Sequence, residues 1–247
     1  MARIELRDCT IYIRDGLSGT ANLSANASAN ATTLNLNTVV TNASVNTLIP
    51  RGARIRVAGE TSPVDHVVTT ANTTANVTDY VTISPALGAG TYNSGNGTGA
   101  VTINSCQLEI KIGEGNLSWS EKKEYEYLLD RGNLDTVKEG NEVPVEVSLE
   151  FVYEHVTTGT SEDISPGDAL KRVGAASEWV SASADLCEPY AVDLVVVHDT
   201  PCASAGIQDE TLTFVDFRHE SLDYDLSAAT VAVSGKCNVS VVTAVRS

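Results

Sequence analysis

The chain has 247 residues and a mass of 26.0 kDa, enough for one large all-β domain or for a core domain with a smaller one. It carries 16 Lys and Arg against 32 Asp and Glu, and this net charge of −16 argues against nucleic-acid binding through a basic face. No stretch approaches the roughly 18 apolar residues of a membrane helix, and the first residues show no secretory signal, so we expect a folded protein made in the cytoplasm.

Composition divides the chain into two parts. Residues 17–104 hold three arginines and three carboxylates and are otherwise dominated by Ala, Asn, Thr, Ser and Gly. Charges also cancel within 1–16, so the whole net charge of −16 falls in 105–247. We therefore predict a core domain that is discontinuous in sequence, made of 1–16 and 105–247, with 17–104 as a small inserted β module.

Within the insert, four short β-like runs are separated by turn residues, at 33–36, 53–57, 66–68 and 80–83. On either side of it, residues 3–7 and 108–112 alternate polar and apolar side chains, which predicts strands with one buried face. The Asp130-Arg131-Gly132-Asn133 and Lys138-Glu139-Gly140-Asn141 sequences carry turn chemistry, so the stretch from Trp119 to Asn141 predicts a long hairpin-like excursion.

The clearest alternation lies in residues 142–154. Apolar residues occupy every second position from Val143 to Tyr153, and four glutamates share the other face: Glu142, Glu146, Glu150 and Glu154. One helix is expected over 166–173, because Ser165 is a good N-cap, Pro166 suits the first helical position and Gly174 ends it. Further β-rich segments follow at 191–198, 210–217 and 230–242, so the fold class is all-β with one short α-helix.

No motif for catalysis, metal binding or a cofactor emerges. A glycosidase needs two carboxylates converging across a pocket, whereas the glutamates of 142–154 form a row along one strand. The four histidines are scattered, and the five cysteines lack the C-x-x-C spacing of a zinc site. Cys187 and Cys202 flank one β-like run and could pair in an oxidising medium. We expect no enzyme activity, no metal and no cofactor.

Several segments resemble the major tail tube proteins of long-tailed, non-contractile bacteriophages. The resemblance is carried by 108–117 (LEIKIGEGNL), 121–132 (EKKEYEYLLDRG), 143–147 (VPVEV), 165–171 (SPGDALK), 188–193 (EPYAVD), 217–222 (FRHESL) and 233–239 (VSGKCNV). It spans nearly all of 105–247 and the first 15 or so residues. The insert resembles small β modules of virion proteins.

This resemblance implies a tail-tube-like β-sandwich or barrel whose inner sheet joins a barrel shared by a hexameric ring. Stacked rings would form the tail tube of the virion, assembled in the host cytoplasm, through which double-stranded DNA passes without specific binding during genome ejection. The implied partners are further copies of the chain and the tape measure, tail tip and tail terminator proteins, with no membrane. The insert would lie outside the tube.

The resemblance implies roles for two sets of residues. The glutamate row, Glu142, Glu146, Glu150 and Glu154, would line the lumen and repel DNA phosphates. The excursion would contact the neighbouring ring, and for this contact we select Lys122, Lys123, Tyr125, Arg131 and Lys138, because basic residues are scarce in the acidic domain.

The sequence is also compatible with two other functions. A related tail component, such as a tail terminator or the inner tube of a contractile tail, would share much of this pattern. The Asn/Thr-rich insert could instead make the chain an adhesive carbohydrate-binding β module, although only Tyr80 and Tyr92 are available in it as aromatic residues to stack on sugars.

Overall fold

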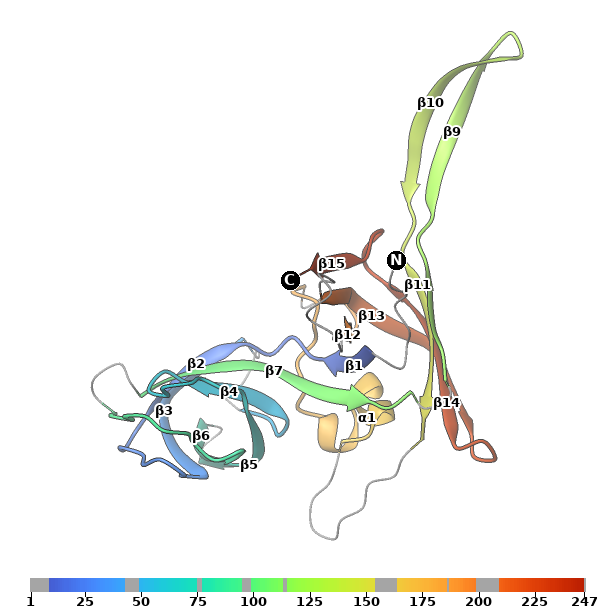
Figure 1. The fold of residues 1–247 in the computed structure, drawn as a ribbon. Coiled ribbons are helices and arrows are strands. Elements are labelled where there is room, and N and C mark those ends of the chain that lie inside the picture. Colours follow the sequence, from blue (N-terminus) through green and yellow to red (C-terminus); the bar gives the residue numbers. More distant parts are fainter. Residues whose placement is uncertain are drawn as a thin grey trace. The chain divides into compact units, whose positions relative to one another are not determined.

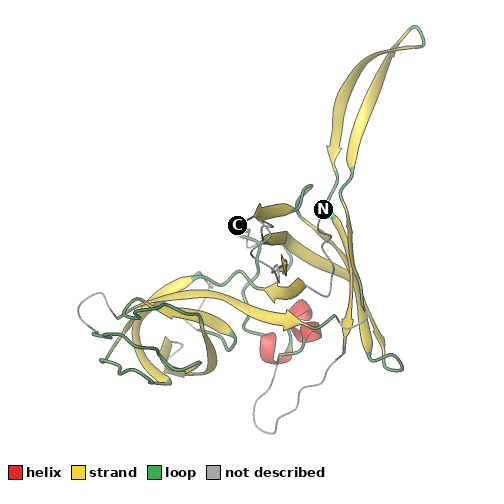
Figure 2. Cartoon of the chain, viewed as in Figure 1, coloured by secondary structure: helices red, strands yellow, loops and turns green. Residues whose placement is uncertain are grey.

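The computed structural model describes residues 9–42, 49–74, 77–94, 99–112, 115–153, 164–185, 187–198 and 209–246. More than half of these residues are in β-strands and there is one short α-helix, which confirms the all-β prediction (Figures 1 and 2). They form two compact units: Met1–Ile13, Glu109–Leu170 and Ala191–Ser247 make the first, and Arg14–Leu108 with Lys171–Tyr190 make the second. The domain boundaries expected from composition stay a prediction.

The second unit contains a closed, six-stranded antiparallel barrel. Its strands are β2 (Gly19–Leu23), β3 (Thr33–Thr41), β4 (Ala53–Val57), β5 (His66–Thr74), β6 (Val77–Ser84) and β7 (Ala100–Ile110). They pair in the order β2-β3-β6-β5-β4-β7, and β7 pairs back onto β2, so the barrel has no open edge. Leu23, Leu34, Ile55, Val81 and Ile103 are fully buried. The four predicted β runs of the insert are confirmed in β3 to β6.

A buried carboxylate ties three segments of this unit together. Asp15 is only 3% exposed, and its side chain accepts hydrogen bonds from the backbone N–H groups of Leu17, Cys106 and Val180 at 3.2, 2.7 and 3.1 Å. Burial raises the pKa of Asp15 to about 6, although these N–H groups pull it the other way. Asp15 thus joins β7 to the segment around Val180.

A second buried polar cluster closes loops of the barrel. His66 Nε2 lies 3.1 Å from Glu60 Oε1, both side chains being fully buried, and His66 Nδ1 lies 2.8 Å from the carbonyl oxygen of Pro85. Glu60 also accepts the backbone N–H groups of Gly88 and Val64 at 2.8 and 3.2 Å. Burial alone would raise the pKa of Glu60, but these hydrogen bonds and the imidazole hold it below its usual value.

The first unit is built on one β-sheet. It contains β1 (Cys9–Arg14), β12 (Val192–His198), β13 (Glu210–Asp225), β14 (Thr230–Cys237), β11 (Glu146–Val152) and β8 (Leu117–Ser120), in that spatial order. A further strand, β15 (Thr243–Arg246), pairs with the first four residues of β13. Alternate residues of β11, Val147, Leu149 and Phe151, are buried, so one face of the sheet contacts the core.

The helix is shorter than expected. α1 spans Pro166–Lys171, and the Asp168 backbone N–H donates to Ser165 Oγ at 3.1 Å, which confirms the predicted N-cap. The predicted end at Val173 is wrong, because Arg172 adopts a left-handed conformation with φ of +55°. A turn of 3₁₀ helix, η2 (Gly174–Ala176), follows. In the part of the chain that the structure describes, no helix is long and apolar enough to span a membrane.

The predicted hairpin is confirmed, with a difference at its end. β9 (Lys123–Asp130) and β10 (Asn133–Glu142) form a two-stranded sheet of their own, joined by Arg131 and Gly132 at φ of +48° and +88°. The sequence pattern predicted one strand over 142–154, but Glu142 ends β10 and β11 begins only at Glu146. Pro144 lies between them and cannot donate a ladder hydrogen bond. Residues 3–7 and Glu154 lie outside the described residues.

Candidate functional site

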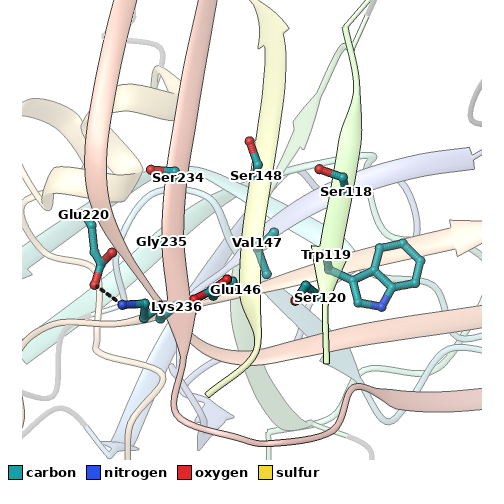
Figure 3. A pocket seen from close by; sticks show the side chains of 10 residues that line it. All are labelled: Ser118, Trp119, Ser120, Glu146, Val147, Ser148, Glu220, Ser234, Gly235 and Lys236. Carbon is teal, nitrogen blue, oxygen red and sulfur yellow. Dashed lines mark ion pairs between the residues drawn. The ribbon is translucent and has the colours of Figure 1, made fainter. Parts of the chain in front are cut away.

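The most distinctive surface of the first unit is the polar face of four strands, β8, β11, β14 and the second half of β13. Register places four serines in one row across these strands: Ser118, Ser148, Ser234 and Ser221. The hydroxyls of Ser221 and Ser234 are hydrogen-bonded at 2.7 Å. Because these side chains are small, a hollow of about 430 Å³ crosses the strands (Figure 3).

The charges on this face differ between its two ends. At the end where β11 begins, Lys122 Nζ lies 2.6 Å from Glu146 Oε2. Figure 3 shows a second ion pair there, in which Lys236 Nζ lies 3.3 Å from Glu220 Oε1. The Lys122 hydrogen bond and charge hold the pKa of Glu146 below its usual value. Basic partners therefore offset the carboxylates at this end.

Three carboxylates gather toward the other end of the same face. Glu150 is exposed and lies opposite Ala232, which in turn lies opposite Asp223. Asp225 occupies the next position of that face on β13, opposite Thr230. The acidic surface is thus made by β11 and β13 together, and not by one strand as the glutamate row predicted.

Both edges of these four strands are open among the described residues. β8 pairs only with β11, so its outer side has no partner strand there. Phe217 pairs with Val192 of β12 on one side and with Cys237 of β14 on the other, but beyond it β13 pairs only with β14. Two exposed edges are templates for pairing with another chain.

The hairpin has one apolar face and one polar face. Leu134 lies opposite Leu129, Val137 opposite Tyr127 and Glu139 opposite Tyr125, so these residues share a face. Its five large apolar and aromatic side chains are between 51% and 72% exposed: Tyr125, Tyr127, Leu129, Leu134 and Val137. We call this surface the apolar hairpin face. An isolated two-stranded sheet is only marginally stable in water. The exposed apolar side chains of this face therefore indicate an interaction surface.

The residues selected for an inter-ring contact lie in different places. Lys122 is at the base of the hairpin, in its pair with Glu146, and Lys123 lies opposite Glu142. Arg131 occupies the turn. Tyr125 is on the apolar hairpin face, whereas Lys138, opposite Glu126, is on the polar one.

Sequence reasoning missed four residues of the apolar hairpin face: Tyr127, Leu129, Leu134 and Val137. The alternation of Tyr125, Tyr127 and Leu129 could have revealed half of it. A bulge between Leu134 and Thr136 breaks the alternation in the second strand.

The described residues include His, Cys, Asp and Glu side chains, the usual metal ligands. Among them, no group of three or more His, Cys, Asp and Glu side chains could hold a metal ion. Burial raises the pKa of Cys106, which hydrogen-bonds through its backbone to Asp15, so this thiol is a core group and not an activated nucleophile. Cys187 is exposed, while Cys202 lies outside the described residues, so the pairing of these two cysteines stays a hypothesis.

Comparison with family models, with curated proteins and with solved structures finds no match for this chain.

Proposed function

We propose that this chain is a major tail tube protein of a long-tailed bacteriophage, a structural subunit that assembles into rings, six copies to a ring, which stack into a tube. The observation that carries the proposal is the four-stranded sheet whose two edges have no partner strand among the described residues. The edges differ, since one is β8 and the other is the second half of β13. Unlike edges pair head to tail, and such contacts form a ring when the rotation from copy to copy closes.

Closure has a physical advantage for this sheet. It pairs the exposed backbone groups of both edges, which removes sites of uncontrolled strand addition. A single-chain barrel of roughly 16 to 18 strands already leaves an aqueous channel, and six copies of a four-stranded sheet exceed that number. The shared barrel would be wide enough for a polymer to pass.

The polar face supports a channel-lining role. Its opposite face is buried in the core of the unit, so the polar face is the one free to line a lumen. Glu150, Asp223 and Asp225 repeat in every copy, and their like charge repels DNA phosphates within a Debye length of about 8 Å. Double-stranded DNA would then slide through without specific binding.

The hairpin supplies a contact for stacking. The apolar hairpin face is exposed in the single chain, and a neighbouring ring would cover it. The tape measure, tail tip and tail terminator proteins are the remaining partners under this proposal, and the location is the virion tail.

The test is electron microscopy of the purified protein at high concentration, together with its mass in solution. Hollow rings or tubes are the expected result. A chain that stays monomeric at every concentration, and also after addition of tail-tip extract, would refute the proposal.

A variant separates ring formation from stacking. Ser120 of β8 lies opposite Glu146 of β11, so a short Gly/Ser linker can join these strands in place of residues 123–142. The hairpin-deleted chain keeps both sheet edges, and we expect it to form rings that do not stack. Circular dichroism matching the full chain is the control for folding.

A further inference from the structure

Two segments of the second unit meet at one end of the barrel. Residues 58–65 connect β4 to β5 at this end, and residues 85–92 follow directly after β6. Glu60 of the first segment and Gly90 of the second form an isolated β-bridge. His66 begins β5, and its side chain and that of Glu60 are both fully buried. Two ionisable side chains are therefore enclosed where the two segments meet.

The Glu60 carboxylate fastens the 85–92 segment to the 58–65 segment. Glu60 Oε1 accepts the backbone N–H of Gly88 at 2.8 Å, and Oε2 accepts that of Val64 at 3.2 Å. Burial alone would raise the pKa of Glu60, but these hydrogen bonds and the imidazole of His66 lower it. The carboxylate is thus charged in a place closed to water, where a charge needs a partner of opposite sign.

The imidazole of His66 has an oxygen atom beside each of its nitrogens. Nδ1 lies 2.8 Å from the carbonyl oxygen of Pro85, and Nε2 lies 3.1 Å from Glu60 Oε1. The Nε2 contact is an ion pair whose hydrogen-bond geometry is poor. A neutral imidazole carries one N–H, so one of its nitrogens would present a lone pair to an oxygen. Protonation of both nitrogens removes this conflict and supplies the cation that Glu60 needs.

Two other titratable groups lie near this pair. The Tyr92 hydroxyl donates to the carbonyl oxygen of Gly88 at 2.8 Å, and burial together with the charge of Glu60 raises the pKa of Tyr92 above 10.0. Asp65 is partly exposed and pairs with Arg54 at 3.2 Å. Because the phenol stays neutral between pH 7 and pH 8, a proton lost from the cluster in this range comes from the imidazole.

We propose that Glu60 and a doubly protonated His66 form a latch, which holds the 85–92 segment on the end of the barrel and opens when the imidazole loses its proton. Loss of the proton leaves a buried carboxylate without its cation, and opening relieves this cost by letting water reach Glu60. The inference goes beyond the proposed function, because it concerns the barrel alone.

The latch predicts how opening depends on pH. A histidine in water has a pKa of about 6.5, so above that pH an opened segment no longer holds the proton that the closed latch retains. Opening then releases one proton, and its equilibrium constant rises about tenfold per pH unit. The latch is therefore most stable below pH 6.5 and weakens as the pH rises.

Hydrogen exchange of the full chain, followed by mass spectrometry at pH 7 and pH 8, tests the opening. After correction for the intrinsic exchange rate, protection of residues 85–92 should be lower than that of β3 and should fall about tenfold between the two pH values. His66→Gln should abolish this pH dependence. His198→Gln is the matched control, because His198 is also buried but lies in the first unit. Protection that does not change with pH, or that equals that of β3, would overturn the latch.

Nitrogen-15 NMR of the histidine rings at pH 7 tests the protonation state in the wild-type chain. A doubly protonated imidazole gives two similar nitrogen shifts, whereas a neutral ring gives two widely separated ones. The His66 signals, assigned by comparison with His66→Gln, should be those of the doubly protonated ring. Widely separated shifts would overturn the latch and leave the proposed function untouched.

Discussion

Replacing Asp15 by Asn tests how a buried carboxylate contributes to the stability of the second unit. Asn preserves the size of the side chain, but one acceptor oxygen becomes an NH₂ group that faces a backbone N–H. The three N–H groups that Asp15 binds cannot all be satisfied by one amide oxygen of this geometry. Loss of one buried hydrogen bond costs about 1 to 3 kcal/mol.

The pH dependence of this cost follows from the pKa of Asp15. Burial raises that pKa from 3.8 to about 6 in the folded chain, so the folded state holds the proton more tightly than the unfolded state. Its contribution to stability is complete below pH 3.8 and is lost as the pH rises to about 6, with a total loss of about 3 kcal/mol. Asn does not titrate. The free energy of unfolding of the wild type minus that of Asp15→Asn should therefore be largest below pH 3.8 and fall by about 2 to 3 kcal/mol between pH 4 and pH 7.

Urea unfolding followed by tryptophan fluorescence measures this difference. The chain has two tryptophans, and Trp179 is fully buried within the second unit. In a Trp119→Phe background, Trp179 alone reports the unfolding of that unit. Asp79→Asn, at an exposed carboxylate of the same unit, is the control. A difference between wild type and Asp15→Asn that stays constant or grows from pH 4 to pH 7 would refute the reasoning.

Three other predictions concern single positions. Glu150→Lys should leave ring assembly intact but slow DNA ejection, because it places a cation on the proposed channel wall, and unchanged ejection in a phage carrying the variant would argue against that wall. Gly16→Ala should lower the melting temperature, because the new Cβ would lie 2.2 Å from the Ser181 carbonyl oxygen. Such overpacking costs about 1 to 3 kcal/mol. An unchanged melting temperature in a calorimetric scan would contradict this prediction. His66→Phe should destabilise the barrel by about 3 to 5 kcal/mol in urea unfolding, because the Glu60 carboxylate stays buried without its imidazole partner. Adding Glu60→Leu should recover part of this loss. Full stability of the single variant would refute the prediction.

Local patterns predicted much of the secondary structure. Alternation located β3 to β6, the buried positions of β11 and most of β12 to β14, because side chains in strands point to opposite faces with a period of two. Turn residues located the β9–β10 hairpin, and Ser165 located the start of α1. Each of these features depends on residues close together in the chain.

The candidate site was predicted only in part, because its parts come from distant segments. The sequence indicated Glu146 and Glu150 on one strand face, but the pairing of β14 with both β11 and β13 brings Asp223 and Asp225 to the same face. The rings of Tyr153 and Tyr224 likewise meet across 71 positions of sequence. No local pattern encodes such neighbours.

The sequence by itself determined the all-β class, the acidic character of residues 105–247 and the amphipathic strands, since composition and alternation are local properties. Only the tertiary structure decided that six strands close into a barrel, that no other described strand pairs with the two edges of the other sheet, and that the side chains of the apolar hairpin face are exposed. The physical reason is that strand partners are selected by long-range hydrogen bonding and by burial of one face, which depend on the whole chain.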